Sequence, residues 1–310
     1  MAVQRGAGPV VVVAQGAVAG GGPLTAATRV YTASLSKQFT AACAALLVRQ
    51  GRLDIETPLA RWLPELPSWA SAIRLRHLVH HIAGLPADEH IDATLGDDED
   101  RTTAAVITAL RRVSSPHRPP GTAFAYSNAG YVCLGLAIQR AAGQPLADLA
   151  RHHLFDPLGM HDTLFWPGPE PMPPASTPLA CPHPAPLSLG DGGVWSTAND
   201  LLRWGQAMNT DVLGISTSLH TPGRLDDGRP LDYAWGIGVR RHAGHPTYRH
   251  GGGWPGLRLL LARVPNLDIG LVIIAPTDDT ERRVPLADAL LTELTSPSPG
   301  FDTASLKPQS

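Results

Sequence analysis

A serine and a lysine stand three residues apart at the start of a helix-like stretch, residues 34–50. Residues three apart on a helix share a face, so the Ser34 hydroxyl and the Lys37 amine can meet. A neutral lysine amine can take the proton of a serine hydroxyl and make the serine a nucleophile. Backbone N–H groups at the helix start would stabilise the oxyanion that follows. The pair therefore indicates acyl transfer through a covalent serine intermediate.

Lysine is scarce in this chain, and its scarcity bears on the alternative that Lys37 is an ordinary exposed helical residue. Of the 25 basic side chains only Lys37 and Lys307 are lysines, and Lys307 lies in a terminal stretch without periodicity. Arginine stays charged, whereas a buried lysine can act as a base. The body of the protein thus keeps one amine, at the position where this chemistry needs it.

Two further clusters carry groups that could assist. Tyr126 and Asn128 lie just before another helix-like stretch, where a phenolate could act as a base and the carboxamide could donate and accept hydrogen bonds. Taken alone, Asn128 could be a helix N-cap and Tyr126 a packing residue. His250 is followed by glycines 251–253 and Trp254, and such glycines let a substrate approach the backbone closely. Taken alone, these glycines could instead form a hairpin turn.

Both strands and helices must position these residues. Short apolar, β-branched runs between turn residues predict strands at residues 9–15, 29–32, 233–240, 247–250, 257–264 and 269–275. Apolar residues at helical spacing predict helices at residues 34–50, 73–81, 102–112, 128–142, 146–154, 197–208 and 281–295. The nine prolines of residues 166–187 predict an extended linker or a stiff surface loop.

The order of these elements predicts an α/β fold made from both ends of the chain. We expect residues 1–51 and 190–296 to form one α/β domain, and residues 52–189 to form an inserted, mostly helical domain. Residues 297–310 are expected to be a disordered tail. A cleft between two such lobes is a favoured place for a ligand site.

The composition excludes several classes of function. With 25 basic and 27 acidic side chains the formal charge is −2, which predicts no binding to nucleic acid and no basic patch for a membrane surface. The three cysteines are widely spaced and predict neither a disulfide framework nor a zinc site. His77, His80 and His81 lie close together, but no acidic or distant third ligand is indicated, so we expect no metal. No cofactor is expected either.

The N-terminal region is informative about the cellular compartment of the protein. Its longest apolar run, residues 10–14, is far too short to span a bilayer. The run could be taken for a signal peptide, but it is shorter than a usual hydrophobic region, and cleavage after Ala19 would remove an expected strand. We therefore expect a cytoplasmic protein.

Taken in order, the three clusters resemble the motifs of a known family. A Ser-x-x-Lys, a Tyr-x-Asn and a basic residue followed by glycines occur in the serine β-lactamase-like family, which includes penicillin-binding DD-peptidases, class C β-lactamases, D-aminopeptidases and family VIII esterases. Residues 75–85, 155–160 and 190–198 resemble three further patterns of that family. The resemblance covers about residues 9–296. It implies a β-lactamase/transpeptidase-like fold, with an antiparallel sheet flanked by N- and C-terminal helices.

The resemblance also implies a role for each site residue. Ser34 is similar to the acylated nucleophile, Lys37 would share in its activation, and Tyr126 is similar to the family's base. Asn128 would hold Lys37 and the acyl side of the substrate, while His250 stands where β-lactamases have a lysine. The implied oxyanion hole is the backbone N–H groups of Ser34 and Gly253. The implied substrate contacts are Gly251, Gly252, Trp254 and Trp195.

The histidine at position 250 decides which member of the family we expect. A histidine is only partly charged near neutral pH, whereas β-lactamases grip a substrate carboxylate with a fixed cation. We therefore expect a hydrolase of a small-molecule ester or amide. The alternatives are an acyltransferase that passes the acyl group to an amine or alcohol in a biosynthetic pathway, a DD-peptidase or weak β-lactamase, and a catalytically silent penicillin-binding-like sensor. The expected partner is a small ester, amide or lactam, and the sequence does not determine the oligomeric state.

Overall fold

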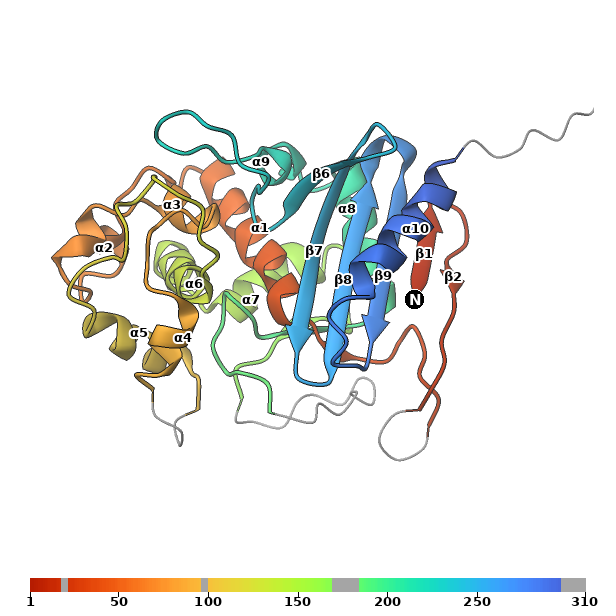
Figure 1. Ribbon diagram of the computed structural model, residues 1–310, viewed down its shortest axis with the longest axis horizontal. Coiled ribbons are helices and arrows are strands. Elements are labelled where there is room, and N and C mark those ends of the chain that lie inside the picture. The colour runs from red at the N-terminus through yellow and green to blue at the C-terminus, as the bar shows by residue number, and fades with distance from the viewer. Residues whose placement is uncertain (18–21, 96–99, 169–183, 297–310) are drawn as a thin grey trace, which may run out of the picture.

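An antiparallel six-stranded sheet in the order β2-β1-β9-β8-β7-β6 is the largest feature of the fold. The computed structural model describes residues 1–17, 22–95, 100–168 and 184–296. The strands are β1 (Ala2–Arg5), β2 (Val11–Val12), β6 (Gly238–His242), β7 (His245–Trp254), β8 (Leu257–Val264) and β9 (Ile269–Ala275). Figure 1 shows α10 (Arg283–Thr295) on one face and α8 (Ala198–Thr210) on the other. The expected antiparallel sheet with flanking helices, built from both ends of the chain, is confirmed.

A group of helices lies on the far side of α1 (Ser36–Arg49) from the sheet (Figure 1). It comprises α2 (Leu59–Trp62), α3 (Leu75–Val79), α4 (Asp88–Asp92), α5 (Thr103–Arg111) and α6 (Asn128–Ala142). The remaining helices are α7 (Leu146–Ala150) and α9 (Ser216–His220). Residues 36–47 of α1 are buried without a break, because α1 packs against α6, α7 and α9. A helix that is buried all round needs small residues, and the alanines and cysteine of α1 supply them.

A second, three-stranded sheet joins distant segments beside α1. Its order is β3-β5-β4, with β3 (Val30–Tyr31), β5 (Val194–Ser196) and β4 (Leu164–Phe165). The N–H of Thr32 donates to the Val194 oxygen at 2.9 Å, so the residue after β3 is tied to the start of β5. This sheet places residues 188–193 next to the start of α1. The domain boundaries at 51 and 190 stay a prediction, and the expected tail at 297–310 lies outside the described residues.

The first predicted strand is wrong in its position. Residues 9–15 contribute only β2, at the edge of the sheet, where Val11 is 61% exposed. The inner position belongs to β1, which pairs with β9 and fully buries Ala2. A β-branched run signals strand propensity but not which strand is central, and β1 is short and half polar, so its pattern was too weak to detect.

Two predicted boundaries move because of glycines. The expected strand at 233–240 begins only at Gly238, since Gly236 has φ of 72° and packs against the Lys37 backbone, where a Cβ would lie 2.6 Å from the carbonyl oxygen. In contrast, β7 continues through glycines 251–253 to Trp254, so the hairpin-turn interpretation of these glycines is wrong. The turn comes afterwards, at Pro255 and Gly256.

Candidate active site

Ser34 lies in a short 3₁₀ turn between β3 and α1. The turn, η1 (Ala33–Leu35), begins with a left-handed residue, since Ala33 has φ of 48°. A non-glycine residue in this region costs about 1–3 kcal/mol and persists where its surroundings enforce it. Ala33 and Leu35 are buried, whereas the Ser34 side chain is only partly buried and lines a cavity of about 560 Å³. The strained turn thus presents one hydroxyl to open space.

Lys37 is fully buried one turn further along the chain. Its Nζ lies 3.2 Å from Ser34 Oγ, 2.7 Å from Asn128 Oδ1 and 2.8 Å from the backbone oxygen of Asp191. It also lies 4.9 Å from the centroid of the Tyr126 ring. The contact that the three-residue spacing implies is therefore present, and groups from two other parts of the chain surround the amine.

Asn128 is the first residue of α6, but it is not the helix cap. Ser127 is the N-cap, because its hydroxyl accepts a hydrogen bond from the Gly130 N–H at 3.0 Å. The Asn128 side chain is left to hold Lys37. Its own N–H donates to both oxygens of Asp88, at 3.0 and 2.9 Å, and the Ala129 N–H donates to the same carboxylate at 3.2 Å. Asp88 thus closes the start of the helix that carries Asn128.

We expect Asp88→Ala to lower the free energy of unfolding by about 1–2 kcal/mol, because two N–H groups at the start of α6 lose their acceptor. Burial raises the pKa of Asp88, whereas the hydrogen bonds from the Asn128 and Ala129 N–H groups lower it and favour the carboxylate. Urea unfolding followed by circular dichroism measures the loss. Asp88→Asn keeps one acceptor oxygen and should recover at least half of it. Equal stability of Asp88→Ala and the unmodified protein would contradict this role.

Arg101 holds the segment that presents the Asp191 carbonyl to Lys37. One guanidinium nitrogen donates to Asp191 Oδ2 and to the Ser188 hydroxyl, both at 2.7 Å, and Nε donates to Asp92 at 2.9 Å. A second cavity of about 140 Å³ lies here, lined also by Ser34. A charge-assisted network on the side of Ser34 away from His250 therefore fixes one acceptor of the lysine amine.

Tyr126 stands at the cavity and is 39% exposed. Its ring stacks on His81 with a centroid distance of 4.2 Å. Among the described residues its hydroxyl has no hydrogen-bond partner, so the phenol is free to meet a substrate. Packing and a chemical role are both compatible with this position, since one face of the ring is buried and the hydroxyl is open.

His250 closes the other side of the cavity. Its Nδ1 lies 2.7 Å from the Gly251 oxygen and its Nε2 lies 3.1 Å from the Tyr233 hydroxyl. Burial, followed by the positive charge of Lys37, lowers the pKa of His250 to about 3. The ring is therefore neutral at physiological pH and does not offer the fixed cation with which β-lactamases hold a carboxylate.

The three glycines after His250 serve different needs. A Cβ on Gly252 would lie 2.3 Å from the Thr32 oxygen, so glycine lets β7 run against the segment before Ser34. A Cβ on Gly251 would meet the Arg283 guanidinium at 2.9 Å. Gly253 has no neighbour closer than 3.8 Å and lines both cavities with Ser34. All three glycines line the larger cavity, and Gly253 lines the smaller one as well.

The two tryptophans expected at the site differ in position. Trp254 lines both cavities. Trp195 lines neither; it is 8% exposed and packs on Tyr31, 5.6 Å between ring centroids, because β5 carries it into the second sheet. A substrate contact at Trp195 stays a prediction, which its position in the second sheet does not favour. Tyr233 and Asp88 were not predicted at the site, and no motif marks them.

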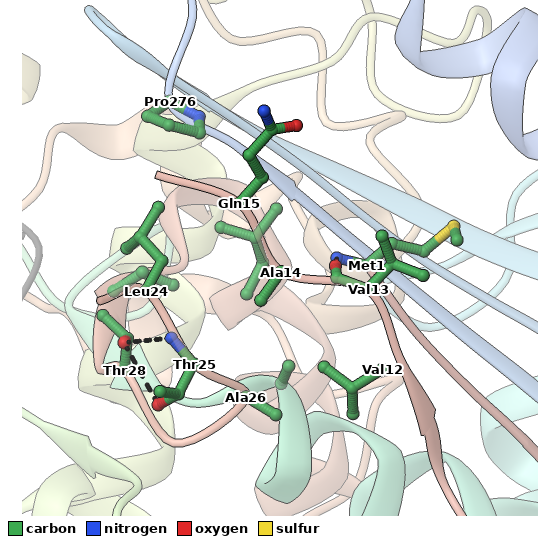
Figure 2. A pocket seen from close by; sticks show the side chains of 13 residues that line it. Met1, Val12, Val13, Ala14, Gln15, Leu24, Thr25, Ala26, Thr28 and Pro276 are labelled. Atoms are coloured by element: carbon green, nitrogen blue, oxygen red, sulfur yellow. Dashed lines mark hydrogen bonds between the residues drawn. The ribbon is translucent and has the colours of Figure 1, made fainter. Parts of the chain in front are cut away.

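Another cavity, of about 130 Å³, lies between the N-terminal segment and β9 (Figure 2). Apolar residues dominate its described lining, and Thr25 and Thr28 hydrogen-bond to each other at its wall. No lysine, histidine or carboxylate side chain is among these lining residues. The cavity therefore lacks the groups for acyl transfer. No cluster of three metal-ligating side chains occurs in the described ranges, and no helix there is both long and apolar enough to cross a bilayer.

Buried histidines should make the protein sensitive to acid. Burial lowers the pKa of His77 and of His80 to about 4, and that of His220 to about 3. Between pH 6.5 and 4 the unfolded chain binds these protons and the folded protein does not, so stability is full above about pH 6.5 and falls with pH. Each fully shifted histidine costs on the order of 3 kcal/mol by pH 4.

Urea midpoints between pH 4.5 and 8 measure this effect. We expect His80→Gln to reduce the slope below pH 6.5, whereas the same change at the exposed His152 should leave it unaltered. A flat profile from pH 6.5 to 4.5 would show that the folded protein takes up these protons too.

The fold and this site define the β-lactamase/transpeptidase-like class of proteins. The sequence model of the Beta-lactamase family matches residues 1–295, and the chain belongs to that family. The family to which the motifs pointed is thereby confirmed.

The similar proteins are penicillin-binding-like proteins and hydrolases. Penicillin-binding protein 4* of Bacillus subtilis (strain 168) is 30% identical over 281 residues, covering 78% of this chain and 59% of that protein. A D-aminopeptidase of Brucella anthropi is 27% identical over 249 residues, covering 76% of this chain and 47% of its own. The crystal structure of D-amino acid amidase from Ochrobactrum anthropi SV3 superposes with a TM-score of 0.79 at 24% identity, covering 94% of each chain. The chain thus spans less than two thirds of the length of the two curated relatives.

Proposed function

We propose that this protein is a serine acyl-enzyme hydrolase that acts on an ester or amide of a small molecule through Ser34, with Lys37 and Tyr126. The observation that supports this most is the set of partners around the lysine amine. Asn128 Oδ1 and the Asp191 carbonyl can only accept hydrogen bonds, whereas the Ser34 hydroxyl can also donate. A neutral amine can satisfy both obligate acceptors with its two hydrogens. Its lone pair then faces Ser34 and can take the hydroxyl proton.

The reaction follows from this geometry. Ser34 Oγ attacks the carbonyl carbon while its proton passes to Lys37, and the oxyanion accepts hydrogen bonds from the N–H groups of Ser34 and Gly253. The bond to the leaving group then breaks as Tyr126 gives its phenolic proton to the departing alcohol or amine, and the Lys37 ammonium returns the serine proton to the phenolate. Water attacks the acyl-enzyme by the same route and releases the acid. Asn128 orients the amine and the acyl side throughout.

Intact-protein mass spectrometry after exposure to an activated ester and to a β-lactam tests the proposal. We expect a mass increase of one acyl group from the ester. Turnover of p-nitrophenyl acetate, nitrocefin and D-alanyl amides then ranks the activities, and the D-aminopeptidase relative makes aminoacyl amides the first natural-type substrates to try. Absence of labelling by both probes would favour the catalytically silent sensor.

The neutral His250 separates the proposed activity from two alternatives. A weak β-lactamase or a DD-peptidase acts on a substrate with a carboxylate, which a neutral ring binds poorly, so we expect nitrocefin to be the poorest of the three substrates. Added amines or alcohols in the same assays reveal an acyltransferase, because they would increase the rate of acyl-enzyme breakdown and yield an acylated acceptor. A cytoplasmic location is part of the proposal and rests on the sequence alone.

A further inference from the structure

Four hydrogen bonds link the Tyr126 segment to His250 in one continuous chain. The Ser127 N–H donates to His81 Nδ1 at 3.1 Å, and His81 Nε2 lies 3.2 Å from the Tyr233 hydroxyl. The same hydroxyl lies 3.1 Å from His250 Nε2, and His250 Nδ1 lies 2.7 Å from the Gly251 oxygen. The chain begins and ends at backbone groups, and Tyr233 is the residue at its centre.

The two backbone groups decide where every proton lies. An N–H can only donate, so His81 Nδ1 is an acceptor and the His81 proton is on Nε2, from which it donates to the Tyr233 oxygen. A carbonyl can only accept, so the His250 proton is on Nδ1 and Nε2 is an acceptor. The Tyr233 O–H therefore donates to His250 Nε2. Each of the two imidazole rings, His81 and His250, is therefore neutral and occurs as a single tautomer.

Protonation of His250 would break this order. A second proton on His250 Nε2 would place two N–H donors, from His81 and His250, against the Tyr233 oxygen. The Tyr233 O–H would then lose its bond to His250 Nε2 in a site where Tyr233 is 7% and His81 1% exposed, and the Tyr131 hydroxyl is the other group in hydrogen-bond contact with it. Losing a buried hydrogen bond while two donors face one oxygen is costly. The chain therefore opposes a positive charge on His250.

The charged groups around His250 also disfavour a positive charge on its ring. The positive charges whose fields reach it are that of Arg283 from α10 and, whenever its amine is protonated, that of Lys37 from α1. Its ring neighbours are Tyr126 and Tyr233, at centroid distances of 6.2 and 5.9 Å. Asp278, the acid at the same cavity, accepts from the Gly256 N–H at 2.7 Å and lies 3.7 Å from Arg258.

We infer that Tyr233 is a positioning residue that holds His250 as the neutral Nδ1–H tautomer, so that His250 itself does not grip a substrate carboxylate. The selectivity part of the inference rests on the proposed function, whereas the proton positions do not. Arg283 and Arg258 also line the cavity, but their guanidinium groups donate to backbone oxygens of β7 and β8 and keep a constant charge. Any dependence on pH between 5 and 8 at this wall therefore comes from His250.

Nitrogen-15 NMR of histidine-labelled protein tests the proton positions directly. We expect the His250 signals, assigned by their loss in His250→Asn, to show the neutral Nδ1–H tautomer from pH 8 to 5. Tyr233→Phe removes the hydroxyl that donates to His250 Nε2 and stabilises the neutral ring, so the apparent pKa of His250 should rise by at least about one unit. Tyr248→Phe is the matched control. Tyr248 lies on β7 two residues before His250, but its ring stacks on His220, with a centroid distance of 4.0 Å, instead of joining the chain of hydrogen bonds. A wild-type His250 that titrates near pH 6.5, or a Tyr233→Phe variant without a shift, overturns the inference.

A matched pair of substrates tests the consequence for selectivity. One ester carries a carboxylate on its leaving group, and the other carries the corresponding carboxamide. We expect the ratio of their kcat/KM values to be independent of pH from 8 to 5 in the wild type. In Tyr233→Phe the ratio should rise toward the carboxylate as the pH falls toward the raised pKa of His250, by up to about tenfold once the ring is protonated, the size of one charge-assisted hydrogen bond. A constant ratio in the variant overturns the selectivity role. Absence of Ser34-dependent turnover would instead refute the proposed function and leave the NMR result standing.

Discussion

Ser34→Ala is expected to abolish acylation and to lower turnover by about 10⁴–10⁶, because the bond-forming oxygen is removed. Lys37 keeps its two obligate acceptors, Asn128 and Asp191, in the variant. The side chain is only partly buried and its loss leaves no buried donor without a partner, so stability should change by less than about 0.5 kcal/mol. Intact-mass labelling with an activated ester, together with a urea melt, measures both quantities.

Ser36→Ala is the matched control for this prediction. Ser36 is two residues away and fully buried, and its hydroxyl accepts the Val194 N–H at 3.1 Å and contacts Thr32 Oγ1 at 3.2 Å. We expect this variant to lose about 1–3 kcal/mol of stability, because a buried N–H loses its acceptor, but to be labelled at Ser34 as before. Equal labelling of Ser34→Ala and the wild type would place the nucleophile elsewhere.

Lys37→Arg is expected to lower kcat/KM by about 10²–10⁴ or more, the range for loss of a positioned proton acceptor. A guanidinium keeps the positive charge but does not give up its proton, so it can donate to Asn128 and Asp191 and cannot take the Ser34 proton. If Lys37 acts only through its charge, the variant should retain activity within tenfold. The comparison therefore separates proton transfer from electrostatic stabilisation.

The structure changes the expectation for the stability of this variant. Lys37 has no exposed surface, and its Nζ already lies within 3.2 Å of Ser34 Oγ, Asn128 Oδ1 and the Asp191 oxygen, so the larger guanidinium has little room. Overpacking of this kind costs about 1–3 kcal/mol. Lys37→Met, which matches the lysine stem more closely, is the companion variant. Activity per folded molecule, corrected by circular dichroism, should be lost in both.

The sequence predicted the local part of this protein well. The Ser34 and Lys37 contact depends on one helical turn, and the ranges of α6, β8 and β9 agree with those expected from periodicity and flanking glycines. These features depend on neighbours in the chain, for which spacing is sufficient information. Family membership also followed from motif order, and it agrees with the match over residues 1–295.

Only the tertiary structure decided which groups surround that pair. Asn128 and the Asp191 carbonyl reach Lys37 across 91 and 154 residues, and Tyr233 joins His250 through a side chain that no motif marks. Sheet pairing likewise put β1 inside and the valine-rich β2 at the edge, although the sequence pattern favoured the reverse. The chain alone thus determines a serine hydroxyl and an amine one helical turn apart. The proton positions of the site depend on hydrogen bonds between segments that spacing along the chain does not relate.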